Sequence, residues 1–408
     1  MNCIISQSGG PTSVINASVV GLVEANFKSK FFDNVYAGLN GIEGILNHNI
    51  INLSKLSTDE LDIFKHTPSS GLGSCRYKLK DFNVDNSEYK SLFNILKELK
   101  ISAFFYIGGN DSMDTTAKLN QYAVKYNIDI KFIGIPKTID NDLMYTDHTP
   151  GFGSAAKFIA TSTLETYLDS TVYINNGIFI LETMGRDTGW LAASSALAHL
   201  NGEEIADFIY LPEIAFNKDK FISDVKQKFN DKNHVFIVVS EGIKNEKGVF
   251  LTEEFTSNNH DKFGHIQLGG VGNYLKNLII SNNITKRVKV LELGVLQRCS
   301  LHCASKTDFE EACMVGQEAL TAAKNGFTGY MIALKRENNS PYKATTFLVE
   351  ANKIANKIKY FPKNWINKDG NNITSEAINY LKPLIRDTPN LDFENYLPKY
   401  KVYARWFF

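Results

Sequence analysis

The chain contains 408 residues, with 44 basic and 44 acidic side chains and a formal net charge of zero at pH 7. This balance argues against generic electrostatic binding to nucleic acid or to an anionic membrane, and no apolar run approaches the roughly 18 residues of a membrane span. The chain is too long to form a single hydrophobic core, which predicts two or three lobes. The five cysteines lack the paired spacing of metal ligands and indicate unpaired thiols in a reducing cytoplasm.

Strand and helix patterns alternate through the first part of the chain. The sequence enters an apolar strand at Cys3 with no charged leader before it, so no signal peptide is expected. Apolar residues recur at helical spacing over 15–27 and 89–99, and Ser87 is a candidate N-cap for the second of these helices. Strands are expected at 3–6, 103–107 and 132–135, and a polar helix is expected from Ser112. This order predicts a parallel sheet with helices on both faces.

The same alternation resumes after residue 150. Strands are expected at 178–181, 235–239, 288–296 and 330–334, with a helix at 190–200. A second βα lobe is expected to begin near Gly151 or Gly153, and 338–341 is expected to be a loop. Residues 341–408 are expected to form a tail that packs on the lobes. The predicted fold class is α/β, with two Rossmann-like βα lobes and mainly parallel sheets.

Two glycine-rich segments, 8–11 and 108–112, follow strands in the N-terminal lobe. Glycines at such positions let backbone N–H groups approach a phosphate, and the next helix adds its positive end. A Gly-Gly pair alone is more often a plain turn. The second segment adds the oxygens of Asn110 and Asp111, which suit a magnesium ion that keeps most of its waters. The alternative for Asp111 or Ser112 is a helix N-cap.

The segment from Pro136 to Asp142 carries the strongest catalytic signal. It follows an apolar strand and places Lys137 ahead of Asp140 and Asp142. In an extended chain Thr138, Asp140 and Asp142 point to one side. Asp140 can then accept a hydroxyl proton while Asp142 faces a metal ion or its waters. Neighbouring strand ends that carry glycines, acids and one lysine indicate phosphoryl transfer, and the alternative is a solvated acidic turn.

Further candidate residues, three of them charged, follow strands of the second lobe. Arginine side chains bind phosphate bidentately, and a carboxylate binds sugar hydroxyls. Any one of these residues alone is more often part of a surface salt bridge, but their shared position at strand ends favours a site. The candidates are Met184, Gly185, Arg186, Glu241 and Arg298. No metal-site spacing links the histidines, and each is interpreted as a satisfied surface or interior histidine: His148, His265 and His302.

Taken in order, these segments resemble the phosphofructokinase family over nearly the whole chain. Segments 8–11 and 108–112 resemble its two phosphate loops, and 136–142 resembles its catalytic segment. Several ordered motifs are more specific than a lone glycine motif. The resemblance implies transfer of a phosphoryl group to C1 of fructose 6-phosphate with magnesium, in two similar lobes with the active site in the cleft between them. It also implies a homo-oligomer, a dimer or tetramer.

The resemblance assigns lobes and site residues. It implies a donor-binding lobe at 1–150 to which about 300–340 return, and a sugar-phosphate-binding lobe at 151–299. The implied catalytic residues are Asp140 as general base, Lys137, Thr138 and Asp111. Donor-binding positions are matched by Gly9, Gly10, Arg76, Gly109, Asn110 and Ser112. Substrate-binding positions are matched by Thr138, Ile139, Asp140, Met184, Gly185, Arg186, Glu241 and Arg298. The implied metal ligands are Asn110, Asp111 and Asp142.

Two charged residues bear on the phosphoryl donor. In ATP-using members the positions of Asp111 and Lys137 are both glycine, whereas here both carry charge, as in the pyrophosphate-using branch. Two like charges about 4 Å apart repel by ~4 kcal/mol at an effective dielectric constant near 20, which is about a thousandfold, so Asp111 disfavours a nucleotide. We therefore expect reversible pyrophosphate-dependent transfer. The alternatives are an ATP-dependent phosphofructokinase, an NAD or lipid kinase, and a non-catalytic regulatory subunit of the same fold.

Three positions depart from the family pattern. Asn110 stands where the family has a magnesium-binding aspartate, so the metal is expected to rely on neighbouring carboxylates. Gly177 replaces an arginine that reaches a neighbouring subunit in many members; Arg287 or Lys289 are candidate substitutes, and the alternative is that this cross-subunit contact is missing. Val295 replaces a histidine that some members direct at the sugar phosphate, and a looser pocket would also admit sedoheptulose 7-phosphate.

Overall fold

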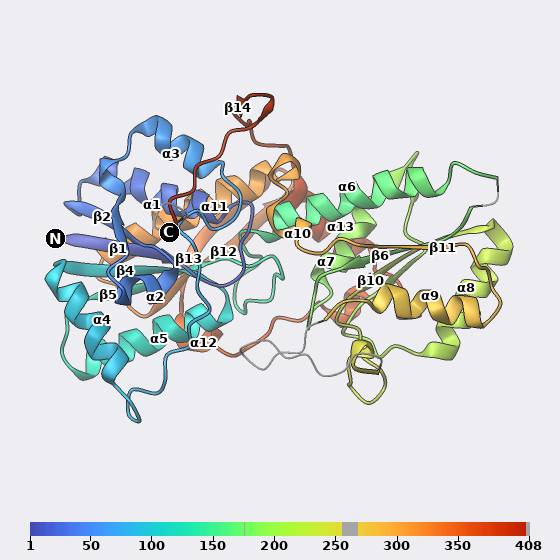
Figure 1. The fold of residues 1–408 in the computed structure, drawn as a ribbon, viewed down its shortest axis with the longest axis horizontal. Helices are drawn as coiled ribbons and strands as arrows, with labels where there is room; N and C mark the ends of the chain where they lie inside the picture. The colour runs from blue at the N-terminus through green and yellow to red at the C-terminus, as the bar shows by residue number, and fades with distance from the viewer. Residues whose placement is uncertain (175, 255–267, 405–408) are drawn as a thin grey trace. The chain divides into compact units, whose positions relative to one another are not determined.

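A computed structural model describes residues 1–174, 176–254 and 268–404, so His265 lies outside the described residues. The chain divides into two compact units (Figure 1). The first unit consists of Met1–Ser154, Arg298–Ile358 and Arg386–Phe408, and the second of Ala155–Gln297 and Lys359–Ile385. None of the helices in the described ranges has the length and apolarity that crossing a bilayer demands.

The first unit contains a seven-stranded sheet with the order β13-β12-β5-β4-β1-β2-β3. Its strands are β1 (Asn2–Gln7), β2 (Asn34–Gly38), β3 (Ile50–Asn52), β4 (Ile101–Gly108), β5 (Lys131–Pro136), β12 (Tyr330–Asn339) and β13 (Tyr342–Glu350). The five central strands run parallel, and only the edge strands β3 and β13 pair antiparallel with their neighbours. The predicted α/β class with mainly parallel sheets is confirmed.

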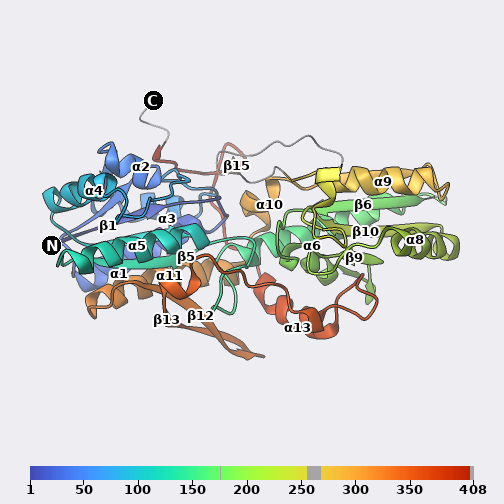
Figure 2. The ribbon, with the colours of Figure 1, turned by 90° about the horizontal axis from the view of Figure 1, so that it is seen from below.

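Helices cover both faces of this sheet because its strands are apolar on both sides. In β4, Phe105 packs into one core with α1 and α11, whereas Phe104 packs into another with α2, α4 and α5 (Figure 2). The helices of this unit are α1 (Ile15–Ser29), α2 (Gly41–Leu46), α3 (Thr58–Lys65), α4 (Ser87–Glu98), α5 (Asn110–Lys125), α11 (Lys306–Lys324) and α12 (Ala351–Ile354), and α6 (Phe152–Ser170) leads into the second unit. A small hairpin pairs β14 (Phe393–Glu394) with β15 (Leu397–Pro398).

Helices α1 and α11 approach each other closely at two glycines. A Cβ atom at Gly21 would lie 2.3 Å from the carbonyl oxygen of Cys313, and one at Gly316 would lie 2.0 Å from that of Ser18. Both separations are far below van der Waals contact, so only glycine fits. This contact joins the first helix of the chain to a helix that begins about 300 residues later.

The second unit contains a four-stranded parallel sheet with the order β11-β6-β10-β9. Its strands are β6 (Gly177–Thr183), β9 (Phe208–Tyr210), β10 (His234–Ser240) and β11 (Val288–Glu292), and a separate hairpin pairs β7 (His199–Leu200) with β8 (Glu203–Glu204). The helices are α7 (Trp190–Ala193), α8 (Lys218–Lys232), α9 (Val271–Ser281), α13 (Ser375–Leu381) and α10 (Leu296–Cys299), which ends at the return to the first unit. An aromatic cluster of Trp190, Phe361, Trp365 and Tyr380 packs the segment Lys359–Ile385 within this unit.

Some predicted elements are wrong in detail. The strand expected at 288–296 ends at Glu292, and the next residues reach helix α10. The helix expected at 190–200 shortens to α7 followed by a 3₁₀ turn at Ser194–Leu197. Ser87 is not the N-cap of α4, because it is already helical, and Asp85 accepts hydrogen bonds from its backbone N–H and its hydroxyl.

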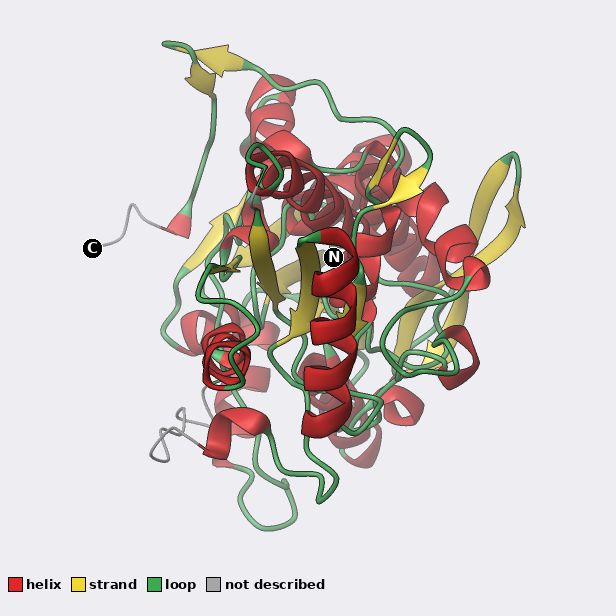
Figure 3. Ribbon diagram, turned by 90° about the vertical axis from the view of Figure 1, so that its right-hand side faces the viewer, coloured by secondary structure: helices red, strands yellow, loops and turns green. Residues whose placement is uncertain are grey.

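The prediction that a tail begins at residue 341 is also wrong, because a strand follows there. Residues Tyr342–Glu350 form β13, which pairs antiparallel with β12 at the edge of the large sheet. The two strands are the long pair of yellow arrows at the right of Figure 3. Most residues of β13 are half-buried or exposed, as expected for an edge strand, so no apolar run marks this strand in the sequence.

Candidate active site

Three loops meet at the carboxyl edge of the large sheet. Strands β1, β4 and β5 are parallel neighbours, so the segments that follow them, 8–10, 108–112 and 137–142, emerge side by side. The backbone N–H of Ser8 donates to the carbonyl of Ile107 at 2.9 Å, and that of Lys137 donates to the carbonyl of Gly108 at 3.0 Å. The two neighbouring strand ends predicted from the sequence therefore do lie together, and β1 adds a third.

Hydroxyl contacts fix the two glycine loops to each other. The hydroxyls of Ser8 and Ser112 share a hydrogen bond of 2.6 Å, and that of Ser8 also donates to the carbonyl of Ile107. A Cβ atom at Gly108 would lie 1.9 Å from the Ser112 oxygen, so a glycine is required there. The N-cap of α5 is Gly109, which forms no side-chain cap. The N-cap alternative for Asp111 or Ser112 is therefore wrong.

Lys137 is a buried lysine in the middle of these loops, with a relative exposure of 2%. Its Nζ donates to the carbonyl of Gly10 at 2.5 Å and would lie 3.3 Å from a Cβ atom at Gly9. Burial lowers the pKa of Lys137 from 10.5 to about 8. The charged side chains that interact with its amine are Asp140, Arg298, Asp142 and Arg76. The site therefore gathers a buried amine, two arginines and two carboxylates from segments far apart in the chain.

The candidate catalytic segment, 136–142, is bent and not extended. Thr138 forms a bridge with Gly151, the chain bends at Ile139 and Asp140, and Asn141 has a φ of 54°. The expectation that residues 138–142 are extended, with three side chains on one side, is therefore wrong. The backbone N–H of Asp140 instead donates to the hydroxyl of Thr138 at 3.1 Å. This turn fixes Asp140 relative to Thr138.

Oxygen atoms at the start of α5 are candidate metal ligands. The side-chain oxygen of Asn110 is buried and accepts no hydrogen bond from the described residues, while its amide donates to the carbonyl of Lys357. Asp111 is exposed in the first helical turn, and Asp142 is half-buried after the bend. Within the described ranges, no three His, Cys, Asp or Glu side chains cluster as a protein metal site would require. The donors fit a cation that takes few protein ligands and keeps water or phosphate oxygens.

The second unit presents its own set of candidates at the ends of β6 and β10. The N–H of Met184 donates to the side chain of Gln297 at 3.1 Å, and that of Gly185 donates to Glu241 at 3.4 Å. The hydroxyl of Ser240 donates to the carbonyl of Gly185 at 2.6 Å, and Gly185 has a φ of 131°. Because this conformation suits only glycine, Gly185 sets the turn that presents Met184 and Arg186 beside Glu241.

Residues 2–323 match the family model described as Phosphofructokinase. The chain belongs to the phosphofructokinase family. A "Pyrophosphate--fructose 6-phosphate 1-phosphotransferase" from Halomonas elongata is 40% identical over 99% of this chain and 96% of its own length. A protein of the same name from Methylococcus capsulatus is 38% identical over 98% of this chain and 95% of its own. The crystal structure of a pyrophosphate-dependent phosphofructokinase from Nitrosospira multiformis superposes with a TM-score of 0.88 at 37% identity, covering 98% of this chain and 95% of that one.

Arg298 lies far along the chain from the residues that it contacts. It belongs to the first unit, where its guanidinium carbon would lie 3.9 Å from a Cβ atom at Gly10 and its carbonyl accepts the hydroxyl of Ser13 at 3.3 Å. The structure thus brings Arg298 together with Lys137. Met184, Arg186 and Glu241 lie in the second unit.

The candidates for a cross-subunit cation lie at the amino end of β6. A Cβ atom at Gly177 would lie 2.4 Å from the carbonyl oxygen of Arg287, so an arginine cannot replace this glycine without a shift of the backbone. The guanidinium of Arg287 lies over the ring of Tyr173, and Lys289 pairs with Asp169 at 3.1 Å. Both cations belong to the second unit.

Glu182 is buried and titratable, and the sequence analysis gave it no role. Glu182, at the end of β6, accepts the N–H of Gly272 at 2.8 Å, and burial raises its pKa from 4.5 to about 7. A carboxylate inside the apolar run of β6 is the signal that could have identified it. His148 is a satisfied interior histidine, as expected, and the sequence did not identify the two carboxylates, Asp147 and Glu311, between which it is buried.

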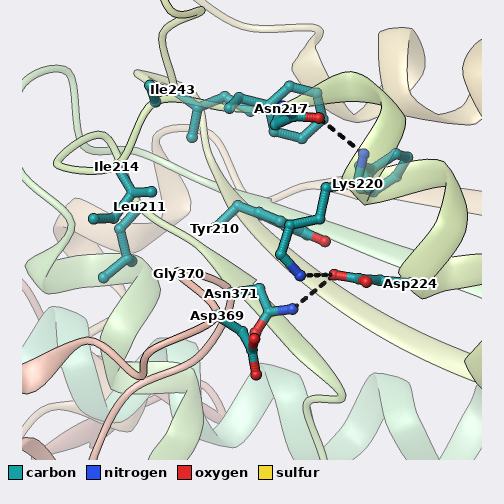
Figure 4. Close-up of a pocket in the computed structure, with 13 residues that line it drawn as sticks. Tyr210, Leu211, Ile214, Asn217, Lys220, Asp224, Ile243, Asp369, Gly370 and Asn371 are labelled. Carbon is teal, nitrogen blue, oxygen red and sulfur yellow. Dashed lines mark hydrogen bonds and ion pairs between the residues drawn. The ribbon is translucent and has the colours of Figure 1, made fainter.

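A separate cavity of about 40 Å³ lies in the second unit (Figure 4). Lys220 pairs with Asp224 at 2.6 Å there, and Asn371 donates to the same carboxylate at 3.0 Å. A cavity of this size has room for a few waters and is far below the roughly 300 Å³ of a typical ligand site. No candidate active-site residue lines it, so we do not assign the reaction to this cavity.

Proposed function

We propose that this protein catalyses the reversible transfer of a phosphoryl group from pyrophosphate to the C1 hydroxyl of fructose 6-phosphate, giving fructose 1,6-bisphosphate and phosphate. The observation that carries the proposal is the buried amine of Lys137, held against the phosphate loop at Gly10. The names of the relatives that are 38% and 40% identical over nearly the whole chain support the same reaction.

The donor is proposed to be pyrophosphate because a buried amine and an exposed carboxylate select by charge and size. The Lys137 amine stabilises the departing phosphate. Pyrophosphate lacks the nucleoside part through which a nucleotide donor would gain further binding contacts. Asp111 repels the additional phosphate of a nucleotide. Arg76 and Arg298 act near the same amine and supply donors suited to bidentate binding of phosphate oxygens.

The acceptor hydroxyl is proposed to lose its proton to Asp140. The bend at Ile139 and the hydrogen bond to Thr138 fix the Asp140 backbone, which supports a role as a positioned base. Met184, Gly185, Arg186 and Glu241 are proposed to contact the sugar phosphate, since arginine binds phosphate and a carboxylate accepts from sugar hydroxyls.

We propose magnesium as the metal, held by Asn110, Asp111 and Asp142 together with water. The buried, unsatisfied oxygen of Asn110 in the described structure supports a cation at this position. When bound, the ion neutralises charge on the phosphate oxygens during transfer. No disulfide joins the five cysteines, all of which lie in the described residues, and this supports a reducing cytoplasm. We also propose a homo-oligomeric state in line with the family.

Two measurements test the proposal. Purified protein is assayed with fructose 6-phosphate and either pyrophosphate or ATP, with magnesium present. Pyrophosphate is expected to support turnover, and a preference for ATP would contradict the charge argument at Asp111 and Lys137. The variant Asp140→Asn is expected to lose at least about a hundredfold in rate. A regulatory subunit would show no turnover in the native protein and would leave its partner's activity unchanged on this substitution.

A further inference from the structure

The imidazole of His148 is buried between two carboxylates in the first unit. It is 1% exposed, and it follows the catalytic segment by six residues. Its Nδ1 lies 2.7 Å from Asp147 Oδ1, and its Nε2 lies 2.6 Å from Glu311 Oε2. Both distances are short for nitrogen–oxygen hydrogen bonds, as expected when both partners are charged.

The partners determine the protonation state of this ring. An ionised carboxylate can only accept, so both imidazole nitrogens must donate, and only the imidazolium has two N–H donors. Burial alone lowers the pKa of His148, but the carboxylates of Glu311 and Asp147 outweigh burial and raise the pKa to about 9. The ring is therefore charged at neutral pH.

Further charged and titratable groups lie around the two carboxylates that contact the ring. Arg336 of β12 donates twice to Asp147 Oδ1, at 3.1 and 2.9 Å. Tyr342 of β13 donates to Glu311 Oε1 at 2.5 Å, and Asp308 lies near Glu311 on α11. Two cations, His148 and Arg336, thus face the two carboxylates that touch the ring.

Hydrogen bonds connect this network to the catalytic segment. The carbonyl of His148 accepts the hydroxyl of Thr146 at 2.8 Å. The next residue, Thr149, donates its hydroxyl to the carbonyl of Thr138 at 2.8 Å, and the carbonyl of Pro150 accepts the N–H of Thr138 at 3.2 Å. Since Thr138 also accepts the N–H of Asp140, a continuous chain of contacts runs from the ring to the proposed base.

Two further elements hold the same stretch, residues 146–151, in place. On the β12 side, the N–H of Asp147 donates to the carbonyl of Leu334 at 2.9 Å. On the α11 side, Asp308 accepts the N–H groups of Gly151 and Ser154 at 2.8 and 2.9 Å. The stretch that supports Thr138 is thus fastened to a strand and a helix from the last third of the chain.

We propose that His148 is a positioning residue for phosphoryl transfer, and that its imidazolium joins Asp147 to Glu311 so that residues 146–151 hold Thr138 and Asp140 in the reacting geometry. The inference rests on the proposed function. A buried ion network adds little net stability compared with an apolar core. We therefore infer that this network serves to fix the position of residues 146–151. A displacement of about 1 Å at a reacting group can lower a rate by about a hundredfold.

The test compares His148→Gln with His234→Gln. His234 is also a buried histidine, but it lies at the start of β10 in the second unit, with Ser170 as its hydrogen-bond partner. His148→Gln is expected to lower kcat by about 10- to 100-fold while both substrate KM values change by less than about threefold. His234→Gln is expected to keep kcat within about twofold. A folded His148→Gln protein with an unchanged kcat would overturn the inference.

A second variant and a spectroscopic measurement cover the case in which His148→Gln does not fold. Tyr342→Phe removes only the hydroxyl that donates to Glu311 and is expected to lower kcat several-fold with unchanged KM. Nitrogen-15 spectra of histidine-labelled wild-type protein are expected to show both His148 ring nitrogens protonated near pH 7.5. A singly protonated ring would overturn the inference, whether or not the wild type is active. A wild type that is inactive with pyrophosphate would instead refute the proposed function.

Discussion

Replacing Lys137 by methionine is expected to remove most of the activity while making the fold more stable. A charged amine about 4 Å from a departing phosphate contributes ~4 kcal/mol at an effective dielectric constant near 20. The variant Lys137→Met should therefore lose about a thousandfold in turnover. Methionine is unbranched and apolar and fits the buried volume of the lysine stem.

The stability gain follows from the pKa of the amine. The folded protein lowers the Lys137 pKa from 10.5 to about 8, so holding the charged form in the fold at pH 7 costs roughly 3 kcal/mol. Losing the hydrogen bond to Gly10 costs about 1 kcal/mol. The variant should gain about 2 kcal/mol in unfolding free energy. Between pH 8 and 10.5 the unfolded chain holds the extra proton, so wild-type stability should rise with pH there, and the variant should lack this rise.

The assay couples fructose 1,6-bisphosphate formation to NADH oxidation, and urea denaturation at pH 7 and pH 9.5 gives the stabilities. Lys118→Met is the matched control, because Lys118 is partly buried on α5 and pairs with Asp114. The control should keep its rate within about twofold. The reasoning is refuted if Lys137→Met retains more than a tenth of the wild-type rate, or if it is less stable than the wild type at pH 7.

Three further substitutions probe the donor loop and the second unit. Asp111→Gly should lower the KM for ATP by at least about tenfold by removing the like charge, and an unchanged KM would exclude the repulsion. Asn110→Asp adds a carboxylate ligand and should lower the magnesium concentration for half-maximal rate several-fold; no change would place the metal elsewhere. Because burial raises the Glu182 pKa from 4.5 to about 7, the wild-type unfolding free energy should fall by roughly 3 kcal/mol as pH rises through that window. Glu182→Gln should abolish this fall in urea titrations, and a persistent fall would assign the titration to another group.

The positions of many candidate site residues were predictable because these residues directly follow buried strands. Apolar runs ending in glycine and acidic residues identify β4 and β5, and parallel neighbours necessarily share a carboxyl edge. The same logic located Met184 and Glu241 after β6 and β10. Local sequence patterns therefore sufficed to locate these strand ends.

The rest depends on contacts between distant segments. Nothing in the sequence around His148 identifies Glu311 as its partner, because that carboxylate lies on α11. The alternating polar residues from Thr138 to Asp142 suggest an extended conformation. The chain bends at Asp140 instead, and this bend depends on the bridge from Thr138 to Gly151, a contact between separate segments. Arg298 was grouped by sequence with the sugar contacts, but its contacts with Gly10 and Ser13 come from the return of the chain.

The glycine contact between α1 and α11 has a consequence for biosynthesis. Val19 and Ile5 share one apolar core with Val315 and Ile332, so a nascent chain that has emerged only to residue 154 cannot complete that core. The ribosome must first synthesise the whole intervening stretch to residue 297. Until then, the apolar surface of residues 1–154 that later packs against α11 and β12 stays exposed. Premature termination within that stretch should therefore give an aggregating product, and chaperones should engage this polypeptide during its translation.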